Sequence, residues 1–264
     1  MSAVIKWTIW MRRWSTMWWS VAIAGFIFIN MVFYPTFKDQ AAELEKSFAD
    51  LPDAALQLFG GSADFFSPVG FLNSQIFFLM LPLMLTILAI SLGSSLIARE
   101  EQDKTLELLL ARSISRGRLL GAKALAGTLI LSAVASAGII VTIICAKIFG
   151  VDVGTVSILV AGLSCWLLAL STGAIAYLLT STGRARSAAL GIAALVGIGG
   201  YLISSLAGTV DWLKVPAKLF PFHYYQPEAI LNGIYDWVYL LFPVAVISLC
   251  AVGAHLAFRR RDIE

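Results

Sequence analysis

The stretch that decides the fold is residues 76–98, IFFLMLPLMLTILAISLGSSLIA. It contains no Asp, Glu, Lys, Arg or His, and it is long enough to cross a bilayer core, which takes about 20 residues of helix. The apolar residues are continuous rather than alternating, which favours a membrane helix over a strand of a membrane barrel. The stretch therefore predicts a transmembrane helix, and Pro82 predicts a kink in it.

Five other stretches have the same apolar character. The six predicted spans are residues 18–34, 76–98, 124–149, 156–181, 188–207 and 237–258. The composition agrees, because 59% of the 264 residues are hydrophobic, 13% are charged and the mean hydropathy is +0.85. A single core could not bury so much apolar surface, which excludes a soluble globule, a disordered chain and a secreted disulfide scaffold. The sequence predicts an all-α polytopic membrane protein with one transmembrane domain over residues 1–264.

The distribution of Lys and Arg predicts the orientation of the chain. If both termini are cytoplasmic, the inside segments carry 14 of the 19 basic residues: Lys6, Arg12, Arg13, Arg99, Lys104, Arg112, Arg116, Arg118, Lys123, Arg184, Arg186, Arg259, Arg260 and Arg261. The positive-inside rule then predicts cytoplasmic termini and a multi-pass protein of the plasma (inner) membrane. The basic excess fits the anionic headgroups of the lipid bilayer, so no nucleic acid is expected as a partner.

Tryptophans at helical spacing precede the first predicted span. Trp7, Trp10 and Trp14 recur every three or four residues, while Lys6 and Arg13 lie elsewhere on the helical wheel. This pattern predicts an amphipathic helix that lies in the membrane interface and bends into the first span as an elbow. The alternative is an aromatic belt at the start of a longer first span.

The side chains needed for most other chemistries are missing. No predicted span contains Asp or Glu, the usual relays of ion-coupled transporters. Cys145, Cys165 and Cys250 lie in apolar stretches without metal-site spacing, so neither a metal site nor a catalytic residue is predicted. The segment from Gly117 to Lys123 has the wrong spacing for a phosphate-binding loop. The chain is therefore not expected to be an enzyme, or to bind ATP or another cofactor itself.

The longest inside loop, residues 97–123, reads IAREEQDKTLELLLARSISRGRLLGAK. Its acids precede its bases, an order that favours a helix through the helix dipole. Leu106, Leu109 and Leu110 form an apolar stripe with i, i+3, i+4 spacing. The loop therefore predicts a short amphipathic helix, either a connector that rests on lipid headgroups or a docking element for a soluble partner. Its length and its charged ends favour docking.

This loop resembles a known family, the permease subunits of ABC-2-type transporters. The family pattern runs as an acidic pair, Gly-Thr-Leu-Glu-Leu-Leu, Pro-x-Ser-Arg and a lysine that opens the next span. The corresponding residues of this chain, in the same order, are Glu100-Glu101, Thr105-Leu106-Glu107-Leu108-Leu109, Ser115-Arg116 and Lys123. The chain departs from the pattern at Lys104, where the family often has glycine, and at Ser113, where it often has proline. The likeness covers essentially the whole chain.

The resemblance implies a cytoplasmic coupling helix between the second and third spans. Its implied contacts with a separate ATPase subunit are Arg99, Glu100, Glu101, Thr105, Leu106, Glu107, Leu109, Arg112, Ser115 and Arg116. It also implies that ATP and Mg²⁺ are bound by the ATPase, and that the permease pairs with a second copy of itself or with a related permease. The family implies export of amphipathic or lipidic compounds, antibiotics or peptides. A membrane anchor or sensor that recruits an ATPase without transport, and an ion-coupled secondary transporter, remain as alternatives.

Small residues in the fifth span predict close helix packing. Ala189, Ala193 and Gly197 recur every four residues, and Gly199 and Gly200 follow. Such small-xxx-small spacing lets two helices approach each other closely. The sequence leaves open whether the neighbour belongs to the same chain or to a second subunit.

Overall fold

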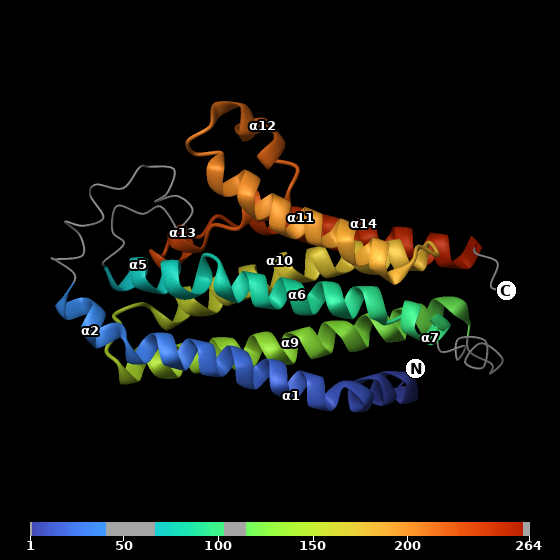
Figure 1. Ribbon diagram of the computed structural model, residues 1–264, viewed down its shortest axis with the longest axis horizontal. Coiled ribbons are helices and arrows are strands. Elements are labelled where there is room, and N and C mark those ends of the chain that lie inside the picture. The colour runs from blue at the N-terminus through green and yellow to red at the C-terminus, as the bar shows by residue number, and fades with distance from the viewer. Residues whose placement is uncertain (1, 41–66, 103–114, 261–264) are drawn as a thin grey trace.

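The computed structural model describes residues 2–40, 67–102 and 115–260, which form a bundle of long apolar helices and contain no strand (Figure 1). The six segments long enough to cross a membrane contain α1 (Ser2–Val32), α6 (Met80–Ser95), α9 (Arg116–Ile148), α10 (Thr155–Ser181), α11 (Arg186–Leu206) and α14 (Val238–Arg260). Each overlaps one predicted span, so the six-span all-α architecture is confirmed. α1 and α9 begin well before their predicted spans, because hydropathy marks only the part of a helix that is apolar.

Shorter elements connect the six long helices. They are α2 (Tyr34–Asp39), α5 (Pro68–Leu72), the π-helical turn η1 (Asn73–Phe77), α7 (Ala98–Gln102), η2 (Asp211–Leu213), α12 (Lys214–Ala217), η3 (Pro221–Tyr224) and α13 (Pro227–Leu231). α5, η1 and α6 together make the second span.

The second span is interrupted just before α6. The Phe78 N–H donates to the Asn73 carbonyl, five residues back, at 2.7 Å, and Leu79 leaves helical geometry at φ −123° and ψ −54°. Pro82 explains this break, because a proline ring clashes with the carbonyl four residues earlier, here that of Phe78. The kink predicted from Pro82 therefore lies one turn before the proline.

α6 and α10 pack together in the centre of the bundle, with α1 lying along α9 on one side and α11 and α14 on the other (Figure 1). α6 and α10 approach each other closely at Gly93 and Gly173, where a Cβ built on Gly93 would lie 2.2 Å from the Gly173 carbonyl oxygen. Only glycine fits at position 93, since a side chain there would push the two helices apart. Small residues make this kind of close contact possible between membrane helices.

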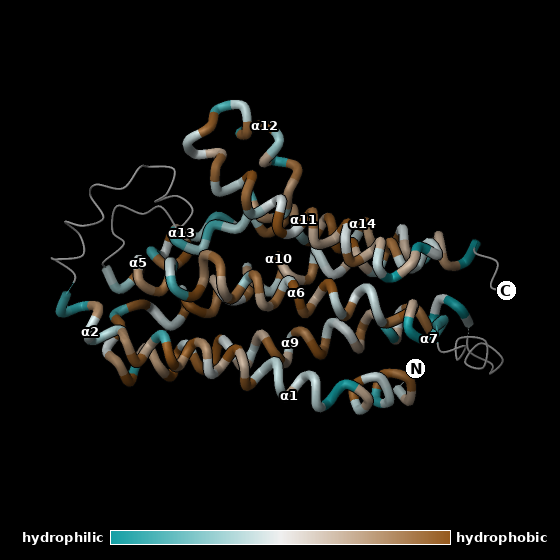
Figure 2. Tube along the Cα trace, in the orientation of Figure 1, coloured by the Kyte–Doolittle hydropathy of each residue, from teal (hydrophilic) through white to brown (hydrophobic). Residues whose placement is uncertain are grey.

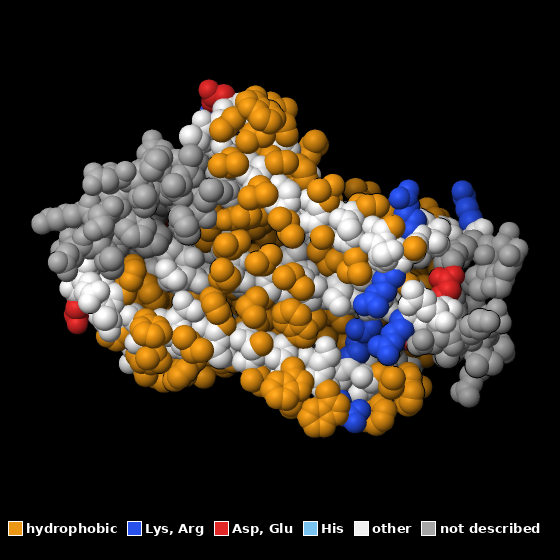
Figure 3. Space-filling view, in the orientation of Figure 1, with side chains coloured by type: hydrophobic (Ala, Val, Ile, Leu, Met, Phe, Trp, Pro, Cys, Tyr) orange, Lys and Arg blue, Asp and Glu red, His pale blue; other side chains and the backbone are white. Residues whose placement is uncertain are grey.

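The helices are apolar along the middle of the bundle, and the hydrophilic residues gather toward the helix ends (Figure 2). Leu195 and Leu249 expose 73% of their surface each, and Ile140 exposes 55%. The space-filling view shows the same apolar band across the molecule (Figure 3). Exposed apolar surface of this extent is what the hydrocarbon chains of a bilayer cover.

The segment between α11 and α14 is held to the bundle by two tyrosines. The Tyr225 hydroxyl donates to the Phe77 carbonyl at 2.6 Å, and the Tyr224 ring stacks on Phe242 with centroids 4.1 Å apart. η3 and α13 pack against the long helices of the bundle, whereas α12 projects from the bundle at the end of α11 (Figure 1). The aromatic contacts therefore fix one half of this segment on the bundle.

α1 is one helix without a break from Ser2 to Val32. Trp7, Trp10 and Trp14 expose 58%, 52% and 60% of their surface, and the Arg13 guanidinium lies 4.0 Å from the Trp10 ring centroid. The predicted N-terminal helix and the first span are thus continuous. The location of the first turns in the membrane interface stays a prediction.

The small residues of α11 pack inside the chain. Ala189 and Ala193 are fully buried, and a Cβ on Gly197 would lie 3.1 Å from the Thr86 side chain of α6. Gly200 is equally close to Phe220. Of the two alternatives that the sequence left open, packing within the chain accounts for these four residues.

Candidate functional site

Basic side chains gather at one end of the bundle, where α1, α9 and α11 begin and where α14 ends (Figures 1 and 3). We call this the basic end; among the described residues, it includes Arg12, Arg99, Arg116, Lys123, Arg186 and Arg259. This clustering is the arrangement that the charge count predicts for the cytoplasmic side. The loop of residues 97–123, in which we expect the site, joins α6 to α9 at this end.

An ion pair between Glu100 and Lys123 closes the base of this loop. The Lys123 ammonium donates to the Glu100 carboxylate, and the side chains are 6% and 24% exposed. Glu100 lies in α7, directly after the second span, whereas Lys123 lies in the second turn of α9. A buried ammonium group needs a charged or hydrogen-bonding partner, so the pair fixes α7 against α9.

Three arginines lie near one another beside this ion pair. The Arg12 Nη2 donates to Ser95 Oγ at 2.6 Å, which ties α1 to the end of α6. Arg99 and Arg186 are near enough to repel the Arg12 charge, and Glu100 is near enough to attract it. Glu100 and Lys123 therefore belong to a cluster of charged side chains from α1, α7, α9 and α11.

The predicted docking residues belong to α7, to the start of α9 and to residues 103–114, which the structure does not describe. Arg99, Glu100 and Glu101 belong to α7, Ser115 is the N-cap residue of α9, and Arg116 is its first residue. The remaining predicted contacts, Thr105, Leu106, Glu107, Leu109 and Arg112, lie outside the described residues. The structure thus places the two ends of the predicted coupling segment at the basic end.

The sequence reasoning missed the partners of the cluster. Arg12 and Ser95 are 83 positions apart, and Glu100 and Lys123 are 23 apart. Periodicity reports only neighbours within a helix, so nothing in the sequence paired Arg12 with Ser95. The family pattern includes both Glu100 and Lys123, but it does not indicate that the two side chains contact each other.

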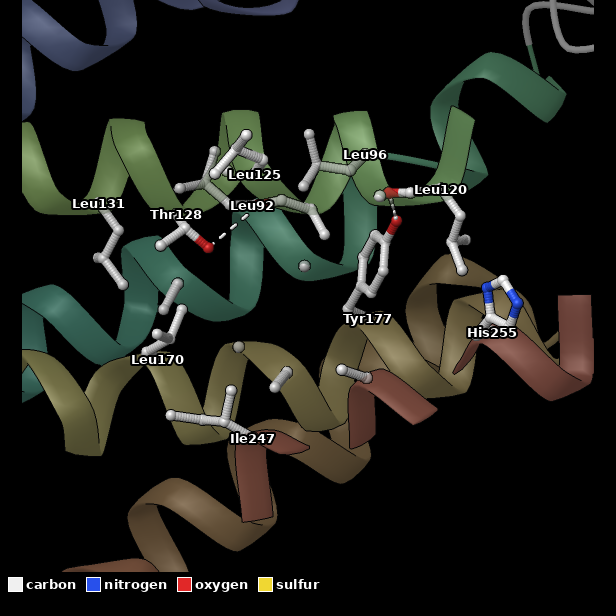
Figure 4. Close-up of a pocket in the computed structure, with 18 of the residues that line it drawn as sticks. Leu92, Leu96, Leu120, Leu125, Thr128, Leu131, Leu170, Tyr177, Ile247 and His255 are labelled. Carbon is white, nitrogen blue, oxygen red and sulfur yellow. Dashed lines mark hydrogen bonds between the residues drawn. The ribbon is translucent and has the colours of Figure 1, made fainter. Parts of the chain in front are cut away.

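An apolar cavity of about 390 Å³ lies beside the basic end, between α6, α9, α10 and α14 (Figure 4). Leu92, Leu125 and Leu170 line it from three of these helices. The Tyr177 hydroxyl donates to the Leu120 carbonyl at 2.8 Å, so its polar atom is already bonded and only its ring faces the cavity. A pocket of this size and character suits a hydrocarbon ligand.

No group of three His, Cys, Asp or Glu side chains in the described ranges comes close enough to hold a metal ion. His255 lies at the basic end, whereas His223 lies in η3 near the other end. Because they lie near opposite ends of the bundle, the two histidines are too far apart to share a ligand. Burial and the charge of Lys218 lower the pKa of His223.

The comparison with known families agrees with the pattern in the basic loop. The family described as ABC-2 family transporter protein matches residues 11–263, nearly the whole chain. No curated protein matches the sequence. With its six membrane-spanning segments, the chain therefore belongs to the ABC-2 transporter family and is a multi-pass membrane permease of an ABC transporter, not the ATPase.

Proposed function

We propose that this permease drives export of an amphipathic or lipidic compound, an antibiotic or a peptide, using ATP hydrolysed by a separate subunit. Membership of the family implies an ABC ATPase as partner. The observation that carries the proposal is the Glu100–Lys123 ion pair, because it joins the elements on either side of the segment between the second and third spans. A force applied to that segment would reach both spans at once.

In this proposal, the ATPase binds the segment 97–123 at the basic end. Arg99, Glu101 and Arg116 would orient the partner through their charges, since charge complementarity sets register at an interface. The apolar stripe of Leu106 and Leu109 would seat the segment in the partner. ATP and Mg²⁺ would be bound by the ATPase, because this chain has no phosphate-binding loop.

The permease would carry the motion inward through its rigid contacts. Lys123 moves with α9, Glu100 moves with α7, and the ion pair keeps the two elements together. α6 packs so closely on α10 at Gly93 and Gly173 that the second and fourth spans would shift as one unit. The pathway would form where this unit meets a second copy of the chain or a related permease.

Reversal of one charge in the segment tests the docking step. We expect Glu107→Lys to weaken ATPase binding and to abolish hydrolysis stimulated by transport, because loss of one side of a desolvated charge pair costs about 2–5 kcal/mol. The control is Asp152→Lys, the same reversal at an exposed position between α9 and α10, at the opposite end of the bundle. Both variants must insert into the membrane and elute as the parent does. Parental ATPase retention and hydrolysis in Glu107→Lys would refute the role of Glu107.

Two other functions make different predictions in vesicles that contain this chain and its ATPase. A membrane anchor or sensor would retain the ATPase without moving any amphiphile when ATP is added. A secondary transporter would move its substrate on an ion gradient without ATP. Export predicts movement that requires ATP hydrolysis and is unaffected by collapse of ion gradients.

A further inference from the structure

The apolar cavity borders a second, basic pocket. The second pocket has a volume of about 430 Å³ and is lined by Ser115, Arg116, Gly117, His255 and Arg259. Gly117 and His255 line both spaces, so the cavity and the basic pocket adjoin at these two residues. One ligand with an apolar body and an acidic head could occupy both.

The basic pocket attracts anions in two ways. Arg116 and Arg259 bring two permanent positive charges from α9 and α14. The pocket also contains the N-terminus of α9, a helix of 33 residues whose N-cap residue Ser115 makes no side-chain capping bond. The N–H groups of a first helical turn lack partners within the helix and carry partial positive charge, so they favour an anion.

The cavity is open on its outer side, between α9 and α14. Gly121, Leu125, Ala251 and His255 are exposed lining residues on these two helices, whereas the lining residues Leu92, Gly93 and Gly173 of α6 and α10 are buried. A Cβ built on Gly121 would meet no atom within 4 Å. The opening therefore faces outward from the bundle, where the bilayer would surround it.

We propose that this site binds one anionic membrane lipid from the leaflet at the basic end. An acyl chain would enter the apolar cavity between α9 and α14, and the acidic headgroup would bind Arg116, Arg259 and the first turn of α9. Charge complementarity selects an acidic lipid rather than a zwitterionic one, and the outward opening selects a bilayer lipid rather than a water-soluble anion. The site goes beyond the proposed export function and does not depend on it.

Retention of defined lipids by the purified full-length chain tests the site. The chain is exchanged into detergent with equal amounts of dioleoylphosphatidylglycerol and dioleoylphosphatidylcholine, and bound lipid is counted by native mass spectrometry. We expect one tightly held phosphatidylglycerol per chain, with at least a tenfold preference over phosphatidylcholine. Equal retention of the two lipids would overturn the proposal.

Two variants separate the two halves of the site. Gly121→Leu places a side chain in the opening of the cavity and should abolish the tightly held lipid, while Gly191→Leu, at a glycine of α11 that also has no neighbour within 4 Å, should retain it. Leucine is a better helix former than glycine, so both variants are expected to fold. Arg259→Gln leaves the cavity intact and should reduce the preference for phosphatidylglycerol by at least fivefold.

The remaining outcomes also decide the question. If a folded Gly121→Leu keeps its lipid, or if Arg259→Gln keeps the full preference, the proposed site is wrong. If Gly121→Leu leaves lipid retention unchanged but dissociates an oligomer, the opening is covered by a second copy of the chain instead. If Gly121→Leu does not fold, the result with Arg259→Gln decides alone.

Discussion

The Lys123 ammonium and the Glu100 carboxylate form an ion pair that joins the start of the third span to the helix that follows the second span. The Lys123 side chain is almost completely buried, with 6% of its surface exposed, whereas 24% of the Glu100 side chain is exposed. A charge at that depth is stable only with its partner. The pair therefore fixes the geometry of the loop base before any ATPase binds.

Removal of one partner should destabilise the permease. Lys123→Met leaves the Glu100 carboxylate without its cation, and we expect the free energy of unfolding in detergent to fall by about 1–3 kcal/mol. Glu100→Gln in the same chain should recover part of the loss, since the carboxylate that lost its lysine partner is then neutral. Denaturant titration of the parent, both single variants and the double variant gives the coupling energy. Additive losses would show that the two side chains do not interact.

Two glycine substitutions should change the stability of the protein in opposite directions, one at the contact between α6 and α10 and one in α1. Gly93→Ala places a methyl group 2.2 Å from the Gly173 carbonyl oxygen, and we expect a loss of about 1–3 kcal/mol through overpacking. Gly25→Ala in α1 meets nothing within 4 Å, and it should stabilise the helix by about 0.5–1 kcal/mol. Thermal midpoints in one detergent compare the two directly. A gain of stability in Gly93→Ala would contradict the close approach of the helices.

The hydrogen bond from Tyr225 to Phe77 predicts that a single oxygen atom anchors the segment between α11 and α14. Tyr225 is 5% exposed, so Tyr225→Phe leaves the Phe77 carbonyl without this donor in apolar surroundings, at a cost of about 1–3 kcal/mol. Tyr224→Phe is the control, because its hydroxyl donates to the Lys218 carbonyl at an exposed site. Hydrogen exchange of α13 should accelerate in Tyr225→Phe alone. Equal exchange in the two variants would rule out the anchor.

The orientation of the chain is testable with single cysteines. The three native cysteines, all buried, are first replaced by alanine. A cysteine at the exposed position of Lys218 should react with an impermeant reagent from outside, and one at the exposed position of Arg184 should react only after permeabilisation. The reverse pattern would overturn the assignment of the basic end to the cytoplasm.

The sequence predicted the six spans because apolar length alone decides which helices can cross a bilayer. It did not predict the π-turn at Asn73–Phe77, because a proline marks a kink without fixing its geometry. The contact of Gly93 with Gly173 and the bond from Arg12 to Ser95 join residues that are far apart in the chain. Such pairs, and the cavity that Gly93 and Gly173 line, depend on how the helices pack, which hydropathy does not encode.

The proposed function depends on a separate ATPase that binds this permease at its basic end. Purification of the tagged chain from its native membrane, with ATP hydrolysis measured in the eluate, tests for this partner. We predict that a subunit with a phosphate-binding loop co-purifies, that the eluate hydrolyses ATP, and that both are lost in Glu107→Lys but kept in Asp152→Lys. A folded, membrane-extracted chain that elutes without any ATP-hydrolysing subunit would contradict the proposal.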